Sequence, residues 1–280
     1  FVVLWSTGYI AAKYAVPGAD PMAFLTWRYA LVVVILLPLA LLWRLPWPER
    51  PINYLHLCIT GVSCHGLGLG GVFLAIDRGV EAGVSALIMG LLPVLAAAVA
   101  AAFLGERLSP RQLLGLILGF AGVALVVSDR LGNGAGSLTG VAWNLVGVVA
   151  FTVGTFYQKA HNQRVNPFIG AVVQFSAAAA ACFLLSLLFG ESEIRWVPQV
   201  FGALVWTVIV LSITATMVLY WLLRRGAMAE VSSLFYLVPV CAALLAWPLF
   251  GETLTIVAFG GMVVTVAGVA LVTRPVVSVS

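Results

Sequence analysis

Long apolar stretches follow one another along the whole chain, separated by short groups of proline, glycine and charged residues. Most stretches are about 20 residues long, the length that a helix needs to cross the hydrocarbon core of a membrane. They are continuous, whereas the strands of a membrane barrel alternate over about ten residues. The pattern therefore predicts helices rather than strands. The expected spans are 1–16, 22–43, 54–76, 82–104, 110–128, 139–160, 167–189, 198–223, 229–250 and 254–273.

Composition excludes most other classes of protein. Hydrophobic residues make up 62% of the 280 residues and charged residues only 9%, against about 25% charged in an average soluble domain. So few charges do not cover a soluble surface. The net charge of +4 comes from cations spread along the chain, which argues against a nucleic-acid binder. We expect an all-α polytopic membrane protein that meets lipid and a small-molecule substrate.

The positions of lysine and arginine predict the orientation. With a cytoplasmic N-terminus, nine of the fourteen cations fall on the inner side and four on the outer side, and Arg28 lies within the second span. Cytoplasmic loops carry the excess of such residues, so both termini are expected in the cytoplasm. The chain begins with Phe1 rather than Met, and the simplest expectation is that natural residues precede it.

An internal repeat divides the chain. Ala121–Val126 and Ala267–Val272 both read AGVALV, at an offset of 146. The same offset relates Pro93 to Pro239 and Lys13 to Lys159.

These matches predict a first repeat at 1–128 and a second at 139–274, joined by a loop at 129–138. Five spans in each half would insert the second half with the opposite orientation. Such inverted repeats are typical of secondary transporters, with the site near the membrane midplane. A duplicated membrane protein without a transport role remains the alternative.

The chain resembles the drug/metabolite transporter superfamily, in particular its ten-span exporters built from two EamA-type repeats. The resemblance rests on Trp5-Ser6-Thr7-Gly8, on Arg28, and on the pattern RGxxAxVSxL…Pro…GExL…AGVALV, which occurs twice with small departures. Within the superfamily, the chain looks most like the YddG-type exporters of aromatic amino acids. The resemblance implies a bacterial inner-membrane exporter with both termini in the cytoplasm.

Few ionisable groups lie within the spans, and such groups suggest function because they are expensive in a membrane. His65 lies centrally in the third span, where it could contact substrate, relay a proton or bond a neighbouring helix. Arg28 could hold a carboxylate through two parallel hydrogen bonds, act as a gate, or fix a helix contact. Gln174 is its uncharged repeat partner.

One face of the first span carries Trp5, Tyr9 and Lys13 at helical spacing. The rings could stack on a flat substrate, and Lys13 could contact a carboxylate or gate the outer mouth. Thr155 and Phe156 are the candidates from the sixth span. Packing between helices is the alternative for each.

Polar groups also enter the fourth and ninth spans. Ser85, Ser232 and Tyr236 are candidates for the substrate cavity, and Pro93 and Pro239 are expected to kink their helices. No catalytic, metal or cofactor motif is apparent. Spans five and ten are expected to serve as packing or homodimer elements outside the transport path.

These features predict an exporter of small amphipathic metabolites, with aromatic amino acids as the first expectation. Lipophilic cations, other amino acids and other metabolites are alternative substrates, and a membrane scaffold is a remote alternative. No aspartate or glutamate is expected at mid-depth, which argues against a site built for cationic drugs. The sequence leaves proton coupling open.

Overall fold

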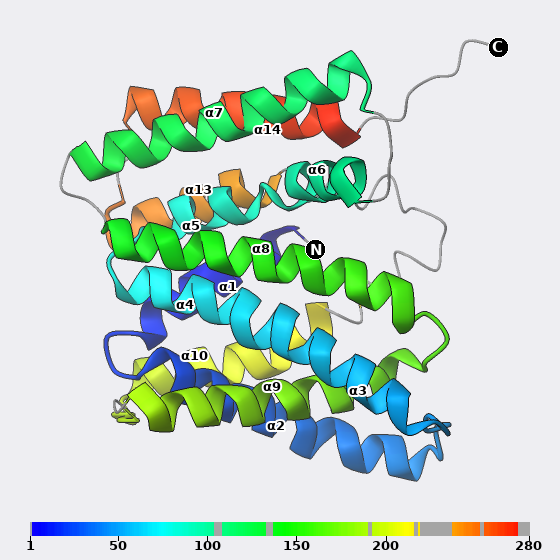
Figure 1. Cartoon of the computed structure of the whole chain (residues 1–280). Coiled ribbons are helices and arrows are strands. Elements are labelled where there is room, and N and C mark those ends of the chain that lie inside the picture. The colour runs from blue at the N-terminus through cyan, green and yellow to red at the C-terminus, as the bar shows by residue number, and fades with distance from the viewer. Residues whose placement is uncertain are drawn as a thin grey trace.

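The computed structural model describes residues 2–103, 108–132, 137–189, 192–215, 218, 237–252 and 255–273. Within these ranges the chain is helical apart from turns and loops, and one isolated bridge joins Ala19 to Ile194. Figure 1 shows the helices side by side, with their ends gathered on two opposite sides of the molecule. The helices are α1 (Val2–Ala15), α2 (Pro21–Leu42), α3 (Pro51–Thr60), η1 (Gly61–Leu69), α4 (Gly70–Asp77), α5 (Ala82–Met89), α6 (Leu92–Phe103), α7 (Pro110–Gly132), α8 (Leu138–His161), α9 (Pro167–Phe189), α10 (Pro198–Trp206), η2 (Thr207–Ala215), α13 (Val238–Phe250) and α14 (Ile256–Thr273).

Seven helical stretches in the described residues are long and apolar enough to cross a membrane, and two shorter apolar helices follow them. The prediction of an all-helical polytopic protein is therefore confirmed, whereas the count of ten spans stays a prediction. The shorter helices are Val238–Phe250 and Ile256–Val272. The long stretches are Pro21–Leu42, Pro51–Asp77, Ala82–Ala102, Pro110–Arg130, Leu138–His161, Pro167–Leu188 and Pro198–Ala215.

Prolines mark where several of these helices begin. Pro21, Pro51 and Pro198 occupy the first turn of α2, α3 and α10. A helix leaves its first backbone N–H groups unbonded, so the missing N–H of proline costs nothing there. Asp20 adds a side-chain cap to α2, because it accepts a hydrogen bond from the Ala23 N–H at 2.7 Å.

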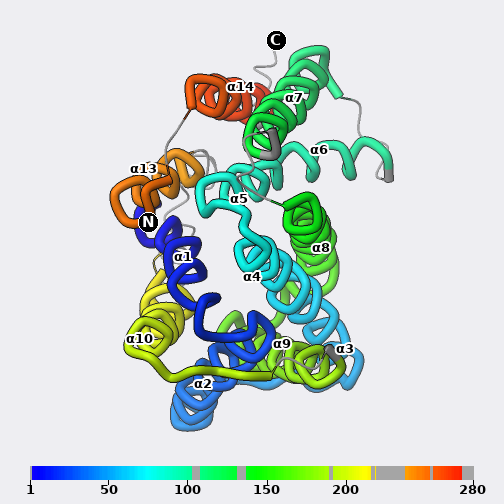
Figure 2. Tube along the Cα trace, turned by 90° about the vertical axis from the view of Figure 1, so that its left-hand side faces the viewer, coloured from blue at the N-terminus to red at the C-terminus, as the bar shows by residue number. Residues whose placement is uncertain are grey.

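The two sides of the molecule can be named by the residues that they carry. The "Lys13 end" is where α1, α4 and α13 stop and α2, α5 and α10 start; it lies on the left in Figure 1 and faces the viewer in Figure 2. The "His56 end" is the opposite side, where α3 begins and α8 stops.

Helices α7 and α14 lie against each other at one edge of the molecule (Figures 1 and 2). A Cβ atom added to Gly115 would lie 2.6 Å from the Gly268 carbonyl oxygen, and one added to Gly122 would lie 2.6 Å from that of Gly261. The offset of 146 relates Gly115 to Gly261 and Gly122 to Gly268, so it exchanges one contact for the other. The glycine faces of these helices therefore contact each other within the chain, and a homodimer would have to use their other faces.

Two π-helical segments, η1 and η2, begin and end 146 residues apart. π-Helical turns are rare and occur frequently at functional sites. Gly61 begins η1 directly against the backbone of Gln174 in α9, where a Cβ atom has no room. Glycine at this position thus permits η1 and α9 to approach each other closely.

The fourth predicted span is interrupted. Helix α5 ends at Met89 and α6 begins at Leu92, so Pro93 is the second residue after the break. Pro239 lies at the start of α13, and its Cγ would be 3.2 Å from a Cβ atom on Gly90. The two repeat-related prolines therefore both lie beside the break between α5 and α6.

Candidate functional site

Side chains from α2, η1, α9 and η2 meet in what we call the His65 cluster, made of Arg28, Tyr29, His65, Gln174, Phe175 and Ser212. Tyr29 stacks on Phe175 with ring centroids 5.5 Å apart, and the His65 ring lies 4.5 Å from Phe175. Tyr29 and Phe175 are related by the offset of 146. The two halves of the chain therefore supply equivalent rings to one cluster.

Arg28 is buried, with 7% of its surface exposed. Its Nε and Nη2 atoms both donate to the Ser212 hydroxyl at 3.2 Å, and its guanidinium lies 5.6 Å from the Tyr29 ring centroid. Within the described ranges no carboxylate forms an ion pair with it. A buried cation without an opposite charge is costly, so this guanidinium is well placed to bind an anion.

His65 adds a second polar group to the same cluster. Its backbone carbonyl accepts a hydrogen bond from the Tyr29 hydroxyl at 2.9 Å, which holds η1 against α2. The ring nitrogen Nδ1 is buried and has no hydrogen-bond partner among the described residues. Buried polar atoms are normally hydrogen-bonded, so Nδ1 is available to a ligand.

The cluster lies well inside the membrane-spanning layer. Arg28 comes about two turns after the start of α2, and His65 is near the middle of the helical stretch Pro51–Asp77. The structure thus brings together Arg28 and His65, which the sequence singled out separately.

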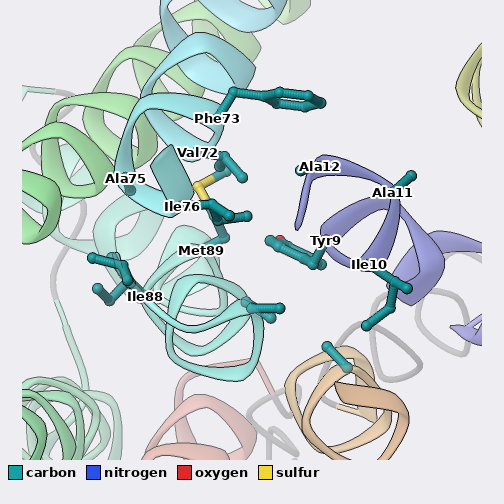
Figure 3. Close-up of a cluster of buried hydrophobic side chains, with 14 of the residues drawn as sticks. Tyr9, Ile10, Ala11, Ala12, Val72, Phe73, Ala75, Ile76, Ile88 and Met89 are labelled. Atoms are coloured by element: carbon teal, nitrogen blue, oxygen red, sulfur yellow. The ribbon is translucent and has the colours of Figure 1, made fainter. Parts of the chain in front are cut away.

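Tyr9 lies elsewhere, in an apolar cluster between α1, α4 and α5. Figure 3 shows its ring directed toward Ile76 and Met89, with Phe73 nearby. Only 8% of the Tyr9 surface is exposed. Trp5 is half-buried one turn earlier and packs against the same core. This apolar cluster lies between the depth of His65 and the Lys13 end.

Lys13 forms an ion pair with Glu252, which follows α13. Glu252 is buried and also accepts hydrogen bonds from the Ala82 and Gly83 backbone N–H groups, at 3.1 and 3.4 Å. It therefore ties α1 and the N-terminus of α5, from the first half, to the end of α13 in the second half.

A second ion pair stands beside the first, between Glu81 and Arg130 at 3.2 Å. Glu81, Arg130 and Glu252 line one small pocket. Burial raises the pKa of Glu81 above its usual range, and Arg130 opposes that shift. The Lys13 end therefore carries a partly desolvated network of charges.

The other predicted residues do not join the His65 cluster in the described part of the chain. The Ser85 hydroxyl is buried and accepts from Asn144 Nδ2 at 2.9 Å, so it fixes α5 against α8. Thr155 is exposed and donates to the Phe151 carbonyl, and Phe156 is half-buried on the same helix. Ser232 and Tyr236 lie outside the described residues.

Sequence reasoning missed Tyr29, Phe175 and Ser212. Tyr29 and Phe175 were detectable, since a search for aromatic residues at the repeat offset finds them. Ser212 left no signal, because it lies 184 residues from Arg28 and no spacing links the two. As for metals, no group of three His, Cys, Asp or Glu side chains suited to an ion occurs in the described ranges.

Comparison with known proteins shows which family the chain belongs to. The model of the EamA-like transporter family matches residues 1–128 and 138–274. The chain is 27% identical over 279 residues to the "Uncharacterized inner membrane transporter YedA" of Escherichia coli K12, covering 97% of this chain and 87% of that protein. It is 26% identical over 278 residues to a "Probable amino-acid metabolite efflux pump" of the same strain, covering 95% and 90%.

The fold also has a solved counterpart. One crystal structure superimposes with a TM-score of 0.63 at 20% identity, covering 97% of this chain and 93% of that one. At this identity the likeness concerns the fold alone. The family match spans both halves, including Arg28 and His65, and the chain belongs to the EamA-like transporter family.

Proposed function

We propose that this membrane transporter exports small amphipathic metabolites that carry a carboxylate, with aromatic amino acids as the first candidates. The observation that carries the proposal is the buried Arg28, whose hydrogen bonds in the described residues go to a hydroxyl rather than to a carboxylate. A guanidinium binds a carboxylate through two parallel hydrogen bonds. A substrate carboxylate would therefore supply the missing negative charge.

The rest of the His65 cluster fits the other parts of such a substrate. Tyr29, Phe175 and the His65 ring offer flat faces, on which an aromatic side chain stacks favourably. The unpartnered Nδ1 of His65 offers a hydrogen bond. A lipophilic cation, by contrast, would meet the positive charge of Arg28, which makes the alternative class a poorer fit.

The relatives support the same class of substrate. One of them is named as an amino-acid metabolite efflux pump, and it aligns over nearly the whole of this chain. The name describes that protein, and it favours amino acids over other small molecules here.

We further propose that the two halves form inverted repeats that rock against each other. Three features support this arrangement: the paired π-helices, the paired rings of Tyr29 and Phe175, and the reciprocal glycine contacts of α7 and α14. Each relates the halves by the same offset. The Lys13 end would face the periplasm. In this structure the path from that end to the His65 cluster would be closed by the apolar cluster around Tyr9 and by the ion pair of Lys13 with Glu252.

Reconstituted protein tests the substrate class. Proteoliposomes preloaded with labelled phenylalanine should release it faster than liposomes that carry the same load but contain no protein. Unlabelled tryptophan should compete strongly, and phenethylamine, which lacks the carboxylate, should compete weakly. Absence of flux above the controls, or stronger competition by phenethylamine and lipophilic cations, would contradict the proposal.

A further inference from the structure

A second cavity opens at the Lys13 end, away from the His65 cluster. Its volume is about 630 Å³, within the range of about 300–1,000 Å³ that is typical of small-molecule sites. We call it the outer vestibule. Both halves contribute to it, through the ends of α1, α4 and α13 and the segment that leads into α10.

The vestibule carries charges of both signs. Lys13 and Arg195 are its cations and Asp77 is its anion. Arg195 is held in place, because its Nη2 donates to the Pro17 carbonyl at 3.2 Å and its backbone N–H to that of Gly18 at 2.8 Å. Asp77 pairs with Arg78 at 3.5 Å, with both side chains partly exposed. An exposed ion pair of this kind contributes little to stability, so the Asp77 carboxylate remains open to a ligand.

An aromatic surface lies beside these charges. Tyr14 and Phe250 line the vestibule with ring centroids 4.9 Å apart and planes tilted by 55°. The Lys13 ammonium lies 4.9 Å from the Phe250 centroid. One small region therefore presents two cations, one anion and two aromatic rings to a ligand.

We propose that the outer vestibule is a second binding site, for a zwitterionic amphipathic amino acid. Lys13 and Arg195 would hold the carboxylate, Asp77 the ammonium group, and Tyr14 with Phe250 the apolar side chain. The chemical class rests on the proposed function, whereas the site itself is separate from the His65 cluster. Bound carboxylate would also compete with Glu252 for Lys13 and so loosen the contact that joins α1 to the end of α13.

Inhibition of efflux from the outside tests this site. In right-side-out vesicles preloaded with labelled phenylalanine, external tryptophan should slow efflux by occupying the vestibule. Arg195→Gln should raise the external concentration needed for half inhibition about tenfold, as expected for the loss of a charge-assisted hydrogen bond. Asp77→Asn, which leaves the Pro17 contact intact, should act similarly. The internal concentration for half-maximal efflux should stay unchanged in both variants.

Two further variants separate charge from folding. Arg195→Lys keeps the cation and should restore most of the external inhibition, and Arg164→Gln removes an exposed cation elsewhere and should behave like the wild type. Equal external inhibition in wild type, Arg195→Gln and Asp77→Asn would overturn the vestibule site while leaving the proposed function intact.

A binding measurement covers the case in which no flux is seen. Thermal stabilisation of the purified protein by phenylalanine should weaken in Arg195→Gln and Asp77→Asn. If that dependence holds without any flux, the vestibule site stands and the proposed function fails. If stabilisation is absent or equal in all variants, the vestibule site is wrong.

Discussion

Arg28 is the residue on which carboxylate recognition depends most directly. Arg28→Met keeps a flexible unbranched stem, shorter than the arginine side chain, but removes the charge and both donors to Ser212. We expect the internal phenylalanine concentration for half-maximal efflux to rise about tenfold or more, because a charge-assisted hydrogen bond contributes about 1.5–3 kcal/mol. Phenethylamine competition should instead become stronger, since that compound has no carboxylate to lose a partner and its ammonium group no longer meets the positive charge of Arg28. Arg164→Met serves as the control, and equal losses for both compounds would point to damaged folding instead.

The same residue shows how far sequence predicts a site. Arg28 and His65 were identifiable because ionisable groups are rare within the apolar stretches. That they share one cluster was not identifiable, because Arg28 lies in α2 and His65 in η1, and their proximity depends on how both elements pack on α9. Tyr9 was expected at the cavity from its helical face. It lies in an apolar cluster, since a face that suits stacking also suits packing against Ile76 and Met89, and its contact with substrate stays a prediction.

At the scale of elements, α7 and α14 depend on close backbone contact. A Cβ atom on Gly261 would lie 2.8 Å from the Gly122 carbonyl oxygen and meet Val126, whereas the preceding residue, Gly260, has open space around it. Gly261→Ala should therefore destabilise the protein by about 1–3 kcal/mol through overpacking. Gly260→Ala is the matched control and should be neutral or slightly stabilising, because alanine favours the helix more than glycine does. Thermal unfolding in detergent measures both, and equal midpoints would contradict the role assigned to this contact.

The helices themselves were largely predictable, because a continuous apolar stretch bounded by proline or charge leaves few alternatives in a membrane. The predicted span 167–189 coincides with α9, and 22–43 differs from α2 by one residue at each end. The π-helical turns and the break before Pro93 were not predicted as such. Hydropathy reports how apolar a segment is, and it carries no information on whether its hydrogen bonds run to the fourth or the fifth residue.

For the whole molecule, the two halves meet at the Lys13 end through Glu252. Glu252→Gln removes the charge that pairs with Lys13 and weakens the acceptor for the Ala82 and Gly83 N–H groups. We expect the Lys13 end to open more often in this variant. In a protein whose native cysteines are replaced, thiol labelling of Met89→Cys, a position buried in the apolar cluster around Tyr9, should become several-fold faster from that side. Glu49→Gln, at the His56 end, should leave the labelling rate unchanged. An unchanged labelling rate in Glu252→Gln would show that the Glu252 contacts do not hold the Lys13 end closed.

The same network should make stability depend on pH. Because burial raises the pKa of Glu81 against the opposing effect of Arg130, the folded protein binds this proton more tightly than the unfolded chain. The free energy of unfolding should therefore rise as the pH falls from the raised pKa toward the ordinary glutamate value of about 4.3. Glu81→Gln removes the titrating group and should flatten this part of the profile. Thermal midpoints recorded between neutral and mildly acidic pH measure the slope, with Glu49→Gln as the control. If Glu81→Gln keeps the wild-type slope, the pH dependence arises from other groups, and the buried network at the Lys13 end does not bind protons in this range.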